Sequence, residues 1–336
     1  MSEYLFYPGC SMESSAKAYS ASLEAVSEPL GITLTEIEDW NCCGATEYLS
    51  LDLLPAYSLI ARNLALAEKL ADGTKTVMAA CSACYLNLSK ADHYMHEDKA
   101  FGAKVNEALA AGGLHYDPGQ LVVRHLLDVI FNDIGLDKVK EKVVKPLTGL
   151  RVASYIGCMV PRPDYNKHSS DTEHTYELDD LLKALGAEVI DFPLKTACCG
   201  GHMTQIGPGT AFELIRRLIS AADEYKADAL VALCPMCQMN LDAFQGQMNG
   251  YFKTNYHIPI LFFTQLMGIA FGIDVKKLGF GSEFVSAREA MSRIGVQTPE
   301  PQEVKPAPKK PAGLPMPPQR ARAGQKVNIG NEEATE

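Results

Sequence analysis

The stretch D-W-N-C-C-G-A-T-E at positions 39–47 has a counterpart later in the chain, T-A-C-C-G-G-H at positions 196–202. In each stretch two adjacent cysteines precede a glycine. Neighbouring side chains on an extended chain point to opposite faces, so one small ion could not easily bind both thiols. Because such an adjacent cysteine pair occurs twice, the sequence indicates a site that is repeated in the chain.

All ten cysteines fall into two copies of one pattern. The first copy reads C-x31-C-C-x37-C-x2-C and the second reads C-x39-C-C-x34-C-x2-C, with a glycine after each adjacent pair. The members are Cys10, Cys42, Cys43, Cys81 and Cys84 in the first copy, and Cys158, Cys198, Cys199, Cys234 and Cys237 in the second. The flanks repeat as well, since Y-L-F-Y-P-G-C matches V-A-S-Y-I-G-C. Chance does not readily produce such a duplication, so each copy is expected to be one structural unit.

Apolar periodicity and turn residues predict the same order of strands and helices in both copies. The predicted strands cover 5–7, 33–38 and 76–80, then 151–156, 188–192 and 229–233; the predicted helices cover 13–29, 55–71 and from 82, then 173–185, 209–226 and from 236. Strands that alternate with helices favour parallel βαβ units. We therefore predict an α/β fold of two pseudo-symmetric Rossmann-like units with parallel sheets, over 1–147 and 148–297. The proline-dense segment 298–336 is predicted to be a disordered tail, either a solvated appendage or a docking strap.

Every cysteine group follows the end of a predicted strand. The carboxyl ends of parallel strands lie along one edge of a sheet, where α/β proteins bind ligands. Several of the cysteines also precede predicted helices, whose N-terminal dipoles favour thiolate over thiol. The five cysteines of each copy are therefore expected to gather in space.

Five thiolates per unit exceed the four that suit tetrahedral zinc or a cubane iron–sulfur cluster. An object with several irons can use adjacent cysteines, because each thiolate can bind a different iron. Glycines after the pairs permit a sharp turn and a close approach of the backbone to cluster sulfur. The spacing favours an iron–sulfur site in each copy. Structural zinc in one copy, and cysteines without metal, remain alternatives.

The bulk composition narrows the class of protein. The 336 residues carry a net charge of −10, which gives no reason to expect a nucleic acid partner. No signal peptide is evident, and the apolar segment 258–272 is too short to span a bilayer comfortably, so we expect a buried strand-to-helix segment there and no transmembrane segment. A cytoplasmic location is expected, where thiols stay reduced and serve metal or redox chemistry.

The two motifs resemble the paired cysteine-rich CCG domains in the B subunit of heterodisulfide reductase. The resemblance covers about 1–280 and extends to Y-P-G-C, W-N-C-C-G, C-C-G-G-H-M, L-C-P-M-C-Q-M-N-L and F-F-T-Q-L-M-G-I-A-F-G. Looser relatives occur in subunits of glycolate oxidase, anaerobic glycerol-3-phosphate dehydrogenase, thiol:fumarate reductase and some succinate dehydrogenases. Many of these carry additional ferredoxin-type cysteine runs, which this chain lacks, so the stand-alone B subunit is the better match.

The resemblance implies one noncubane [4Fe–4S] cluster on each five-cysteine set. It also implies a small disulfide or thiol substrate between two clusters, with cleavage of the S–S bond or, in a thiol- or sulfur-oxidising pathway, its formation. The partners it implies are a C-like iron–sulfur subunit and an A-like flavoprotein subunit. The segment 258–272 and the tail are then candidate contact surfaces for those partners.

Disulfide reduction also needs proton donors. His202 directly follows C-C-G-G and is the first candidate, with a structural histidine as the equal alternative; Lys195 is the second candidate. His168 and His174 are expected at the surface. In several relatives a histidine follows the first cysteine of the second copy, but Met159 stands at that position here, which removes one donor.

Two other functions remain open from the sequence. The chain could be an electron-transfer or quinone-linked module of a multi-subunit dehydrogenase, as in the looser relatives. It could also be a zinc-stabilised scaffold that assembles partners. The reaction direction is not encoded, because it depends on the potentials of substrate and electron partner.

Overall fold

The structure is a computed structural model that describes residues 2–45, 47–162, 172–299 and 301. His168 and most of the predicted tail, from residue 302 onward, lie outside this range.

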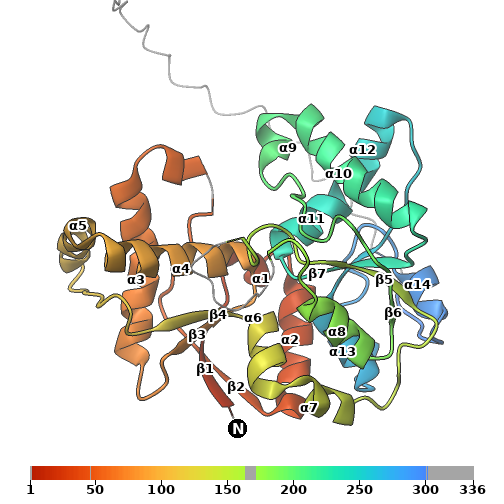
Figure 1. The fold of residues 1–336 in the computed structure, drawn as a ribbon, viewed down its shortest axis with the longest axis horizontal. Coiled ribbons are helices and arrows are strands. Elements are labelled where there is room, and N and C mark those ends of the chain that lie inside the picture. Colours follow the sequence, from red (N-terminus) through yellow and green to blue (C-terminus); the bar gives the residue numbers. More distant parts are fainter. Residues whose placement is uncertain (1, 46, 163–171, 300, 302–336) are drawn as a thin grey trace, which may run out of the picture. The chain divides into compact units, whose positions relative to one another are not determined.

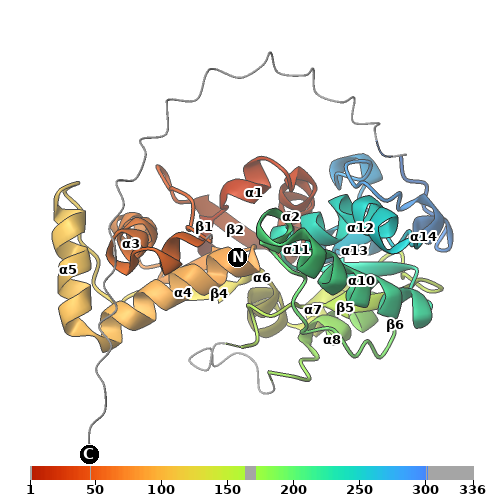
Figure 2. The ribbon, with the colours of Figure 1, turned by 90° about the horizontal axis from the view of Figure 1, so that it is seen from above.

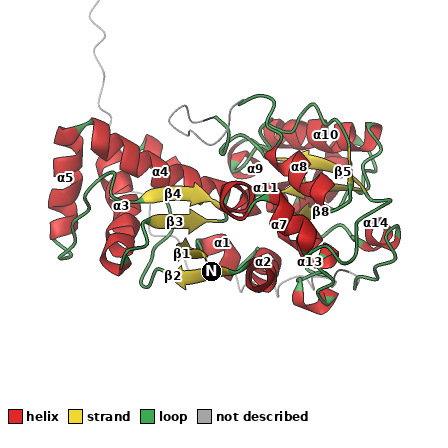
Figure 3. Cartoon of the chain, turned by 60° about the horizontal axis from the view of Figure 1, so that its bottom comes forward, coloured by secondary structure: helices red, strands yellow, loops and turns green. Residues whose placement is uncertain are grey.

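Two four-stranded parallel sheets form the framework, one in each repeat (Figures 1 and 3). The strand order is β2-β1-β3-β4 in the first and β6-β5-β7-β8 in the second. The strands are β1 (Ser2–Tyr7), β2 (Ile32–Glu36), β3 (Thr76–Ala79), β4 (Val122–His125), β5 (Arg151–Tyr155), β6 (Glu188–Val189), β7 (Ala229–Ala232) and β8 (Ile260–Phe262). All neighbouring strands pair in parallel, with the register Tyr7↔Ala79 in one sheet repeated as Tyr155↔Ala232 in the other. The predicted pseudo-symmetric α/β fold is confirmed; the domain boundaries at 147 and 297 stay predictions.

Helices connect the strands and cover the sheets. The first repeat contains α1 (Cys10–Glu13), α2 (Lys17–Leu30), α3 (Leu53–Leu70), α4 (Ser82–Glu97), α5 (Lys99–Ala110), α6 (Leu126–Asp128), the π-helix η2 (Val129–Ile134) and α7 (Leu136–Glu141). The second contains α8 (Glu177–Ala184), α9 (Met203–Ile206), α10 (Pro208–Glu224), α11 (Pro235–Ala243), α12 (Gln245–Phe252), α13 (Phe263–Ala270) and α14 (Arg288–Ser292). Short 3₁₀ turns are η1 (Glu47–Ser50) and η3 (Val275–Lys277). Most predicted helices are therefore present, within a few residues of their predicted ends.

The prediction differs from the structure at several elements. The helix expected over 13–29 is divided into the short helix α1 and the longer helix α2, which begins at Lys17. The helix expected over 173–185 begins only at Glu177, where three acidic residues in the first turn suit a helix N-terminus. The strand expected over 188–192 is the two-residue edge strand β6, and Pro193 follows soon after without an N–H to extend the ladder. Strand β4 was not predicted, because V-V-R-H interrupts its apolar run with an arginine and a histidine.

Helices of the two repeats lie side by side (Figure 2), and buried residues from both repeats form one hydrophobic core. Helix α2 of the first repeat packs against α13 of the second, and α6 of the first packs against α8 of the second. Tyr19 stacks on Phe262 with ring centroids 4.3 Å apart, and the hydroxyls of Ser22 and Thr264 lie 2.6 Å apart in the same contact. The expected strand-to-helix segment 258–272 is confirmed, and every residue of α13 is buried. The expectation that this segment is a partner contact is wrong, because α2 already covers it.

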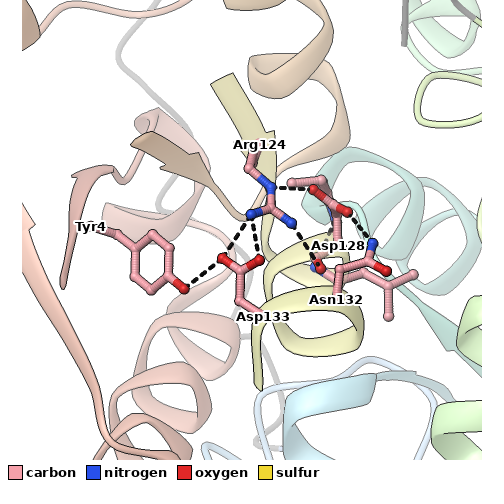
Figure 4. A network of polar contacts seen from close by, with 7 residues as sticks. Tyr4, Arg124, Asp128, Asn132 and Asp133 are labelled. Atoms are coloured by element: carbon pink, nitrogen blue, oxygen red, sulfur yellow. Dashed lines mark hydrogen bonds and ion pairs between the residues drawn. The ribbon is translucent and has the colours of Figure 1, made fainter. Parts of the chain in front are cut away.

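A network of hydrogen bonds and ion pairs connects β1 and β4 of the first repeat to the helical segment α6–η2 (Figure 4). Arg124 on β4 donates to Asp128 at 2.5 Å and to Asp133 at 2.6 Å. Tyr4 on β1 donates to Asp133 at 2.8 Å, and burial together with that bond raises the pKa of Tyr4 to about 12. The network therefore joins two strands to the helical segment α6–η2 that packs on the second repeat.

Candidate functional site

The cysteine groups lie beyond the carboxyl ends of equivalent strands in the two sheets. Cys10 and Cys158 follow β1 and β5, whereas Cys81 and Cys234 follow β3 and β7 as N-caps of α4 and α11. Gly9 and Gly157, which precede Cys10 and Cys158, both have a φ of 73°. A side chain at Gly9 would place its Cβ 2.8 Å from the sulfur of Cys84, so glycine is needed there for both backbone and space.

The first five thiols form a series of neighbouring pairs. The sulfurs of Cys10 and Cys42 lie 3.7 Å apart. Cys43 interacts through hydrogen bonds with both Cys42 and Cys84, and Cys84 interacts with Cys81. The structure therefore gathers this whole predicted set, although its members are up to 74 positions apart in the chain (84 − 10).

The second five thiols are arranged in a similar way. Cys158 and Cys198 interact through their side chains, and the sulfurs of Cys199 and Cys237 lie 3.3 Å apart. Cys237 in turn interacts with Cys234. The amides of Gly200 and Gly201 point at sulfur, with N-to-S distances of 3.4 Å to Cys198 and 3.3 Å to Cys199. The backbone after the adjacent pair thus directs N–H donors at the cysteine sulfurs.

The two sets meet at one point. The sulfur of Cys81 lies 3.8 Å from the sulfur of Cys234, and both residues are buried. These cysteines hold the same position in the two repeats, so the pseudo-symmetry axis passes near their contact. The phenol of Tyr19 and the imidazole of His125 are both close enough to Cys234 for electrostatic interaction.

Two buried asparagines support the adjacent cysteine pairs, and the sequence analysis missed both. The amide of Asn87 donates to the carbonyl of Cys43 at 2.9 Å, and the amide of Asn240 donates to the carbonyl of Cys199 at 2.5 Å. Each asparagine comes three residues after the last cysteine of its set, so C-x2-C-x2-N occurs in both repeats. That repeated spacing was the signal that could have revealed them.

Two buried tyrosines also support the backbone of the adjacent cysteine pairs. The hydroxyl of Tyr7 donates to the carbonyl of Asn41 at 2.7 Å, and the hydroxyl of Tyr155 donates to the carbonyl of Ala197 at 2.7 Å. Each carbonyl belongs to the residue just before an adjacent cysteine pair. Burial, then the nearby thiols, raise the pKa of both phenols well above the usual value. These tyrosines therefore remain neutral hydrogen-bond donors at ordinary pH.

The thiols themselves differ in protonation. Hydrogen bonds from Cys42 and Cys84 lower the pKa of Cys43 to about 4, while the same contact with Cys43 raises the pKa of Cys42. In the second set, the hydrogen bond from Cys158, the amide of Gly200 and the positive charge of Arg162 lower the pKa of Cys198 to about 6. Each set thus contains a thiol prepared to act as a thiolate ligand.

A cavity of about 240 Å³ opens between the repeats. All five cysteines of the first set line it, and the second repeat contributes the opposite wall, including His202, Met236 and Phe244. His202 lies directly before α9, at the margin of this cavity. The structure therefore brings this predicted proton donor next to the first thiol set, and its role stays a prediction.

Lys195 is held in a different way. Its ammonium lies 2.6 Å from the carboxylate of Asp179, and both side chains are largely buried. Its carbonyl accepts the amides of Ile156 and Gly157, both at 2.9 Å, which fixes the turn before Cys158. These contacts give Lys195 a structural role, and proton donation by it stays a prediction.

Three further residues near the cysteine motifs differ in their burial. Met159 is half-buried against the core of the first repeat, and His174 is exposed, as expected for a surface residue. His125, which sequence reasoning missed, is fully buried at the end of β4, and burial lowers its pKa to about 4. Its Nδ1 accepts the amide of Leu127 at 3.1 Å, and its Nε2 lies 3.5 Å from the hydroxyl of Ser82. His125 is therefore a neutral histidine behind the junction of the two sets.

The donor arrangement can be tested against the expected metal groups. Among the residues that the structure describes, no three His, Cys, Asp or Glu side chains converge on a point that could hold a metal ion. The thiols instead form a series of neighbouring pairs, and in the second set two backbone N–H groups point at sulfur. This arrangement fits a group that presents several irons to separate thiolates better than it fits a single tetrahedral zinc ion.

Comparison with known proteins places this geometry in a family. The Cysteine-rich domain model CCG matches residues 4–89 and again residues 152–242. A protein from Archaeoglobus profundus, described as like the B subunit of heterodisulfide reductase, is 31% identical, over 83% of this chain and 93% of its own length. The chain belongs to the family of heterodisulfide reductase B subunits and their relatives. Its CCG domains accordingly indicate iron–sulfur binding within an oxidoreductase complex.

Other members of this family show how its functions vary. The 8-methylmenaquinol:fumarate reductase membrane anchor subunit of Wolinella succinogenes is 35% identical, over 85% of this chain and 98% of its own length. The B subunit of the ferredoxin:CoB-CoM heterodisulfide reductase of Methanosarcina mazei is 27% identical, over 88% of this chain and 97% of its own length.

A solved structure shares the fold alone. The crystal structure of a hypothetical protein from Helicobacter pylori has a TM-score of 0.67 at 15% identity and covers 84% of this chain. This chain spans about half (52%) of that structure's length. Within the described part of the chain, no helix is long and apolar enough to cross a membrane.

Proposed function

We propose that this chain is the catalytic iron–sulfur subunit of a heterodisulfide reductase-like complex, which reduces a small disulfide to two thiols or runs in reverse. The observation that carries the proposal is the contact of the two cysteine sets at Cys81 and Cys234, with sulfurs 3.8 Å apart. Cleavage of one S–S bond takes two electrons, and two one-electron centres close to the same substrate can deliver one each. The duplicated sets, in contact at their equivalent positions, support a pair of such centres.

The reaction balances with an external electron source. One disulfide, two electrons and two protons give two thiols, as the S–S bond breaks and each sulfur takes one electron and one proton. When bound, the two noncubane [4Fe–4S] clusters would supply the electrons, one each. A C-like iron–sulfur subunit and an A-like flavoprotein subunit are the proposed source of those electrons, in the cytoplasm.

The chain's own residues hold and shape the site. Cys10, Cys42, Cys43, Cys81 and Cys84 would hold one cluster, and Cys158, Cys198, Cys199, Cys234 and Cys237 the other. Asn87 and Asn240 fix the backbone of the adjacent pairs, so their thiols keep one direction. Apolar side chains of the second repeat line part of the cavity, and His202, which also lines it, would deliver a proton to a departing sulfur.

Metal analysis tests this proposal. We expect the anaerobically purified chain to contain about eight irons and a matching amount of acid-labile sulfide, as two four-iron clusters require. Addition of the correct thiol should produce a new EPR signal in the oxidised protein. Zinc without iron would contradict the proposal and support the scaffold function instead.

A second function is favoured by the Wolinella succinogenes relative. Its name assigns it to a methylmenaquinol:fumarate reductase, so this chain could instead pass electrons between a quinone and a dehydrogenase. In that case the iron content would be the same, but no thiol would change the EPR signal. A naphthoquinol would then reduce the clusters in the complete complex, whereas a thiol would not.

A further inference from the structure

Large apolar side chains lie at the surface around the N-terminal end of helix α3. Leu51 is 80% exposed, Leu53 is 56% exposed and Leu59 is 48% exposed, and these three are here named the leucine patch. The neighbouring Leu54 packs on the core of the first repeat, so this short segment has buried and exposed leucines side by side. Single exposed leucines are common in soluble proteins, but three within nine positions indicate a surface that another molecule covers.

Hydrogen bonds join the leucine patch to the first adjacent cysteine pair. The side-chain amide of Asn41 donates to the carbonyl of Leu59 at 2.9 Å and to the carbonyl of Cys42 at 3.0 Å. Arg62, about one turn further along α3, donates to the side chain of Asn41 at 3.1 Å and pairs with Asp39. Cys42 is exposed, and none of the three leucines lines the cavity. A molecule bound on the patch therefore lies next to the first thiol set but outside the cavity.

The leucine patch belongs to an acidic stretch of the chain. The sequence over 36–61 contains five Asp or Glu and no Lys or Arg. Among them, the exposed Asp52 stands between two of the leucines and caps α3 through the amide of Leu54. The corresponding helix of the second repeat, α10, differs, because Arg216 and Arg217 lie within its first ten residues. Anionic lipid headgroups would be repelled by the acidic stretch, whereas a basic protein face is complementary to it.

We propose that the leucine patch is the docking surface for an electron-transfer protein whose contact face is apolar and ringed by Lys or Arg. The docking rests on the exposed leucines and the charge around them, whereas the electron-transfer role of the partner rests on the proposed function. Electrons then enter or leave through the first thiol set, since the patch adjoins Cys42 and the acidic stretch is not repeated at α10.

Cytochrome c is a probe with this chemistry, because it is a basic one-electron protein with lysines around its exposed haem edge. Its ferric form is titrated by calorimetry into the oxidised, anaerobically purified full chain, so that no electron is transferred. We expect Leu51→Ser to weaken binding about tenfold, because the contact loses one buried leucine. The control is Val144→Ser, at a position that is 72% exposed and outside the patch, which should leave the affinity unchanged. Equal losses in the two variants, or no binding by the wild-type chain, would overturn the inference.

A pair of double variants tests the charge. Glu38→Gln combined with Asp52→Asn removes two charges, and asparagine keeps the cap of α3. We expect this variant to bind cytochrome c about tenfold more weakly at about 10 mM salt, with a smaller loss at about 150 mM. The control combines Glu97→Gln with Glu107→Gln, which removes the same charge from exposed positions on α4 and α5. If both double variants lose affinity alike, only the overall charge matters and the inference is wrong.

Two further measurements separate the alternatives. Binding to phosphatidylglycerol vesicles that is lost in Leu51→Ser, without binding to cytochrome c, would identify a membrane surface and overturn the inference. If the variants behave as expected but no thiol changes the EPR signal, the docking surface is supported and the disulfide function is wrong. If a thiol changes the EPR signal but no variant alters the affinity for cytochrome c, the disulfide function stands and the docking surface is wrong.

Discussion

In the first repeat, the adjacent pair Cys42–Cys43 borders the large cavity, whereas the second-repeat pair Cys198–Cys199 lies beside the guanidinium of Arg162. Both pairs have the same backbone support from an asparagine and a tyrosine. The two repeats therefore share the residues that support the backbone of the cysteine pairs, but they differ in the residues that surround those pairs. The two sets therefore differ in their surroundings: the first borders the cavity, and the second has a cationic neighbour that favours the thiolate form of Cys198.

A second difference lies behind the junction of the sets. His125 and Arg124 on β4 correspond by register to Phe262 and Leu261 on β8. The first repeat thus has the ion-paired Arg124 where the second has the buried Leu261, and the buried His125 where the second has Phe262, which stacks on Tyr19. Equivalent backbone positions can be stabilised by either means, provided that every buried polar group has a partner.

The largest expected effect comes from removing a ligand. Cys43→Ser should lower the iron content by about half, because one of two proposed clusters loses a thiolate, and should abolish disulfide turnover. Cys199→Ser is the matched variant and should remove the other EPR signal. Metal analysis and EPR on both proteins make the measurement. Survival of both signals in either variant would show that the five-ligand assignment is wrong.

The polar network provides the next largest effect. Arg124→Leu copies the apolar residue of the second repeat but leaves Asp128 and Asp133 without their cation. Because Asp128 is buried, we expect the free energy of unfolding to fall by about 3 kcal/mol. Denaturant unfolding checks this value. The control is Lys183→Leu, which removes a surface ion pair and should cost less than about 1 kcal/mol; equal losses would contradict the proposed importance of the network.

Loss of one supporting asparagine should have a smaller, local effect. Asn87→Ala leaves the buried carbonyl of Cys43 without a donor, which should cost about 1–3 kcal/mol. In the metal-free chain, Cys43 should then react faster with a maleimide, and in the loaded chain only the first cluster's EPR line shape should change. Asn240→Ala should affect only the second. If each variant disturbs both signals alike, the asparagines stabilise the fold in general and do not position individual ligands.

The smallest expected effect is a difference in thiol reactivity. Cys42 and Cys198 are both exposed, but the pKa of Cys42 is raised and that of Cys198 is lowered to about 6. At about pH 7 in the metal-free chain, Cys198 is therefore mainly thiolate and Cys42 mainly thiol. Iodoacetamide should label Cys198 first, as followed by peptide mass spectrometry, and Arg162→Ala should slow this labelling modestly. Faster labelling of Cys42 would reverse the electrostatic comparison of the two sets.

Much of the fold could be predicted because strand and helix periodicities are local. The central strands β1, β3, β5 and β7 are apolar runs that end just before cysteines, and the sequence analysis found all of them. Edge strands were harder to predict from the sequence. β4 and β6 are short and include polar residues, so their identity depends on the neighbour with which they pair.

The sequence by itself determined the duplicated α/β units and the membership of the two cysteine sets, because residue spacing and repetition need no knowledge of distant contacts. Only the tertiary structure decided that Cys81 meets Cys234, that Asn87 and Asn240 hold the cysteine pairs, and that α13 packs inside against α2. These are contacts between parts of the chain that are distant in sequence. A pattern of residues can indicate that side chains share a task, but their meeting point depends on how both repeats build one core.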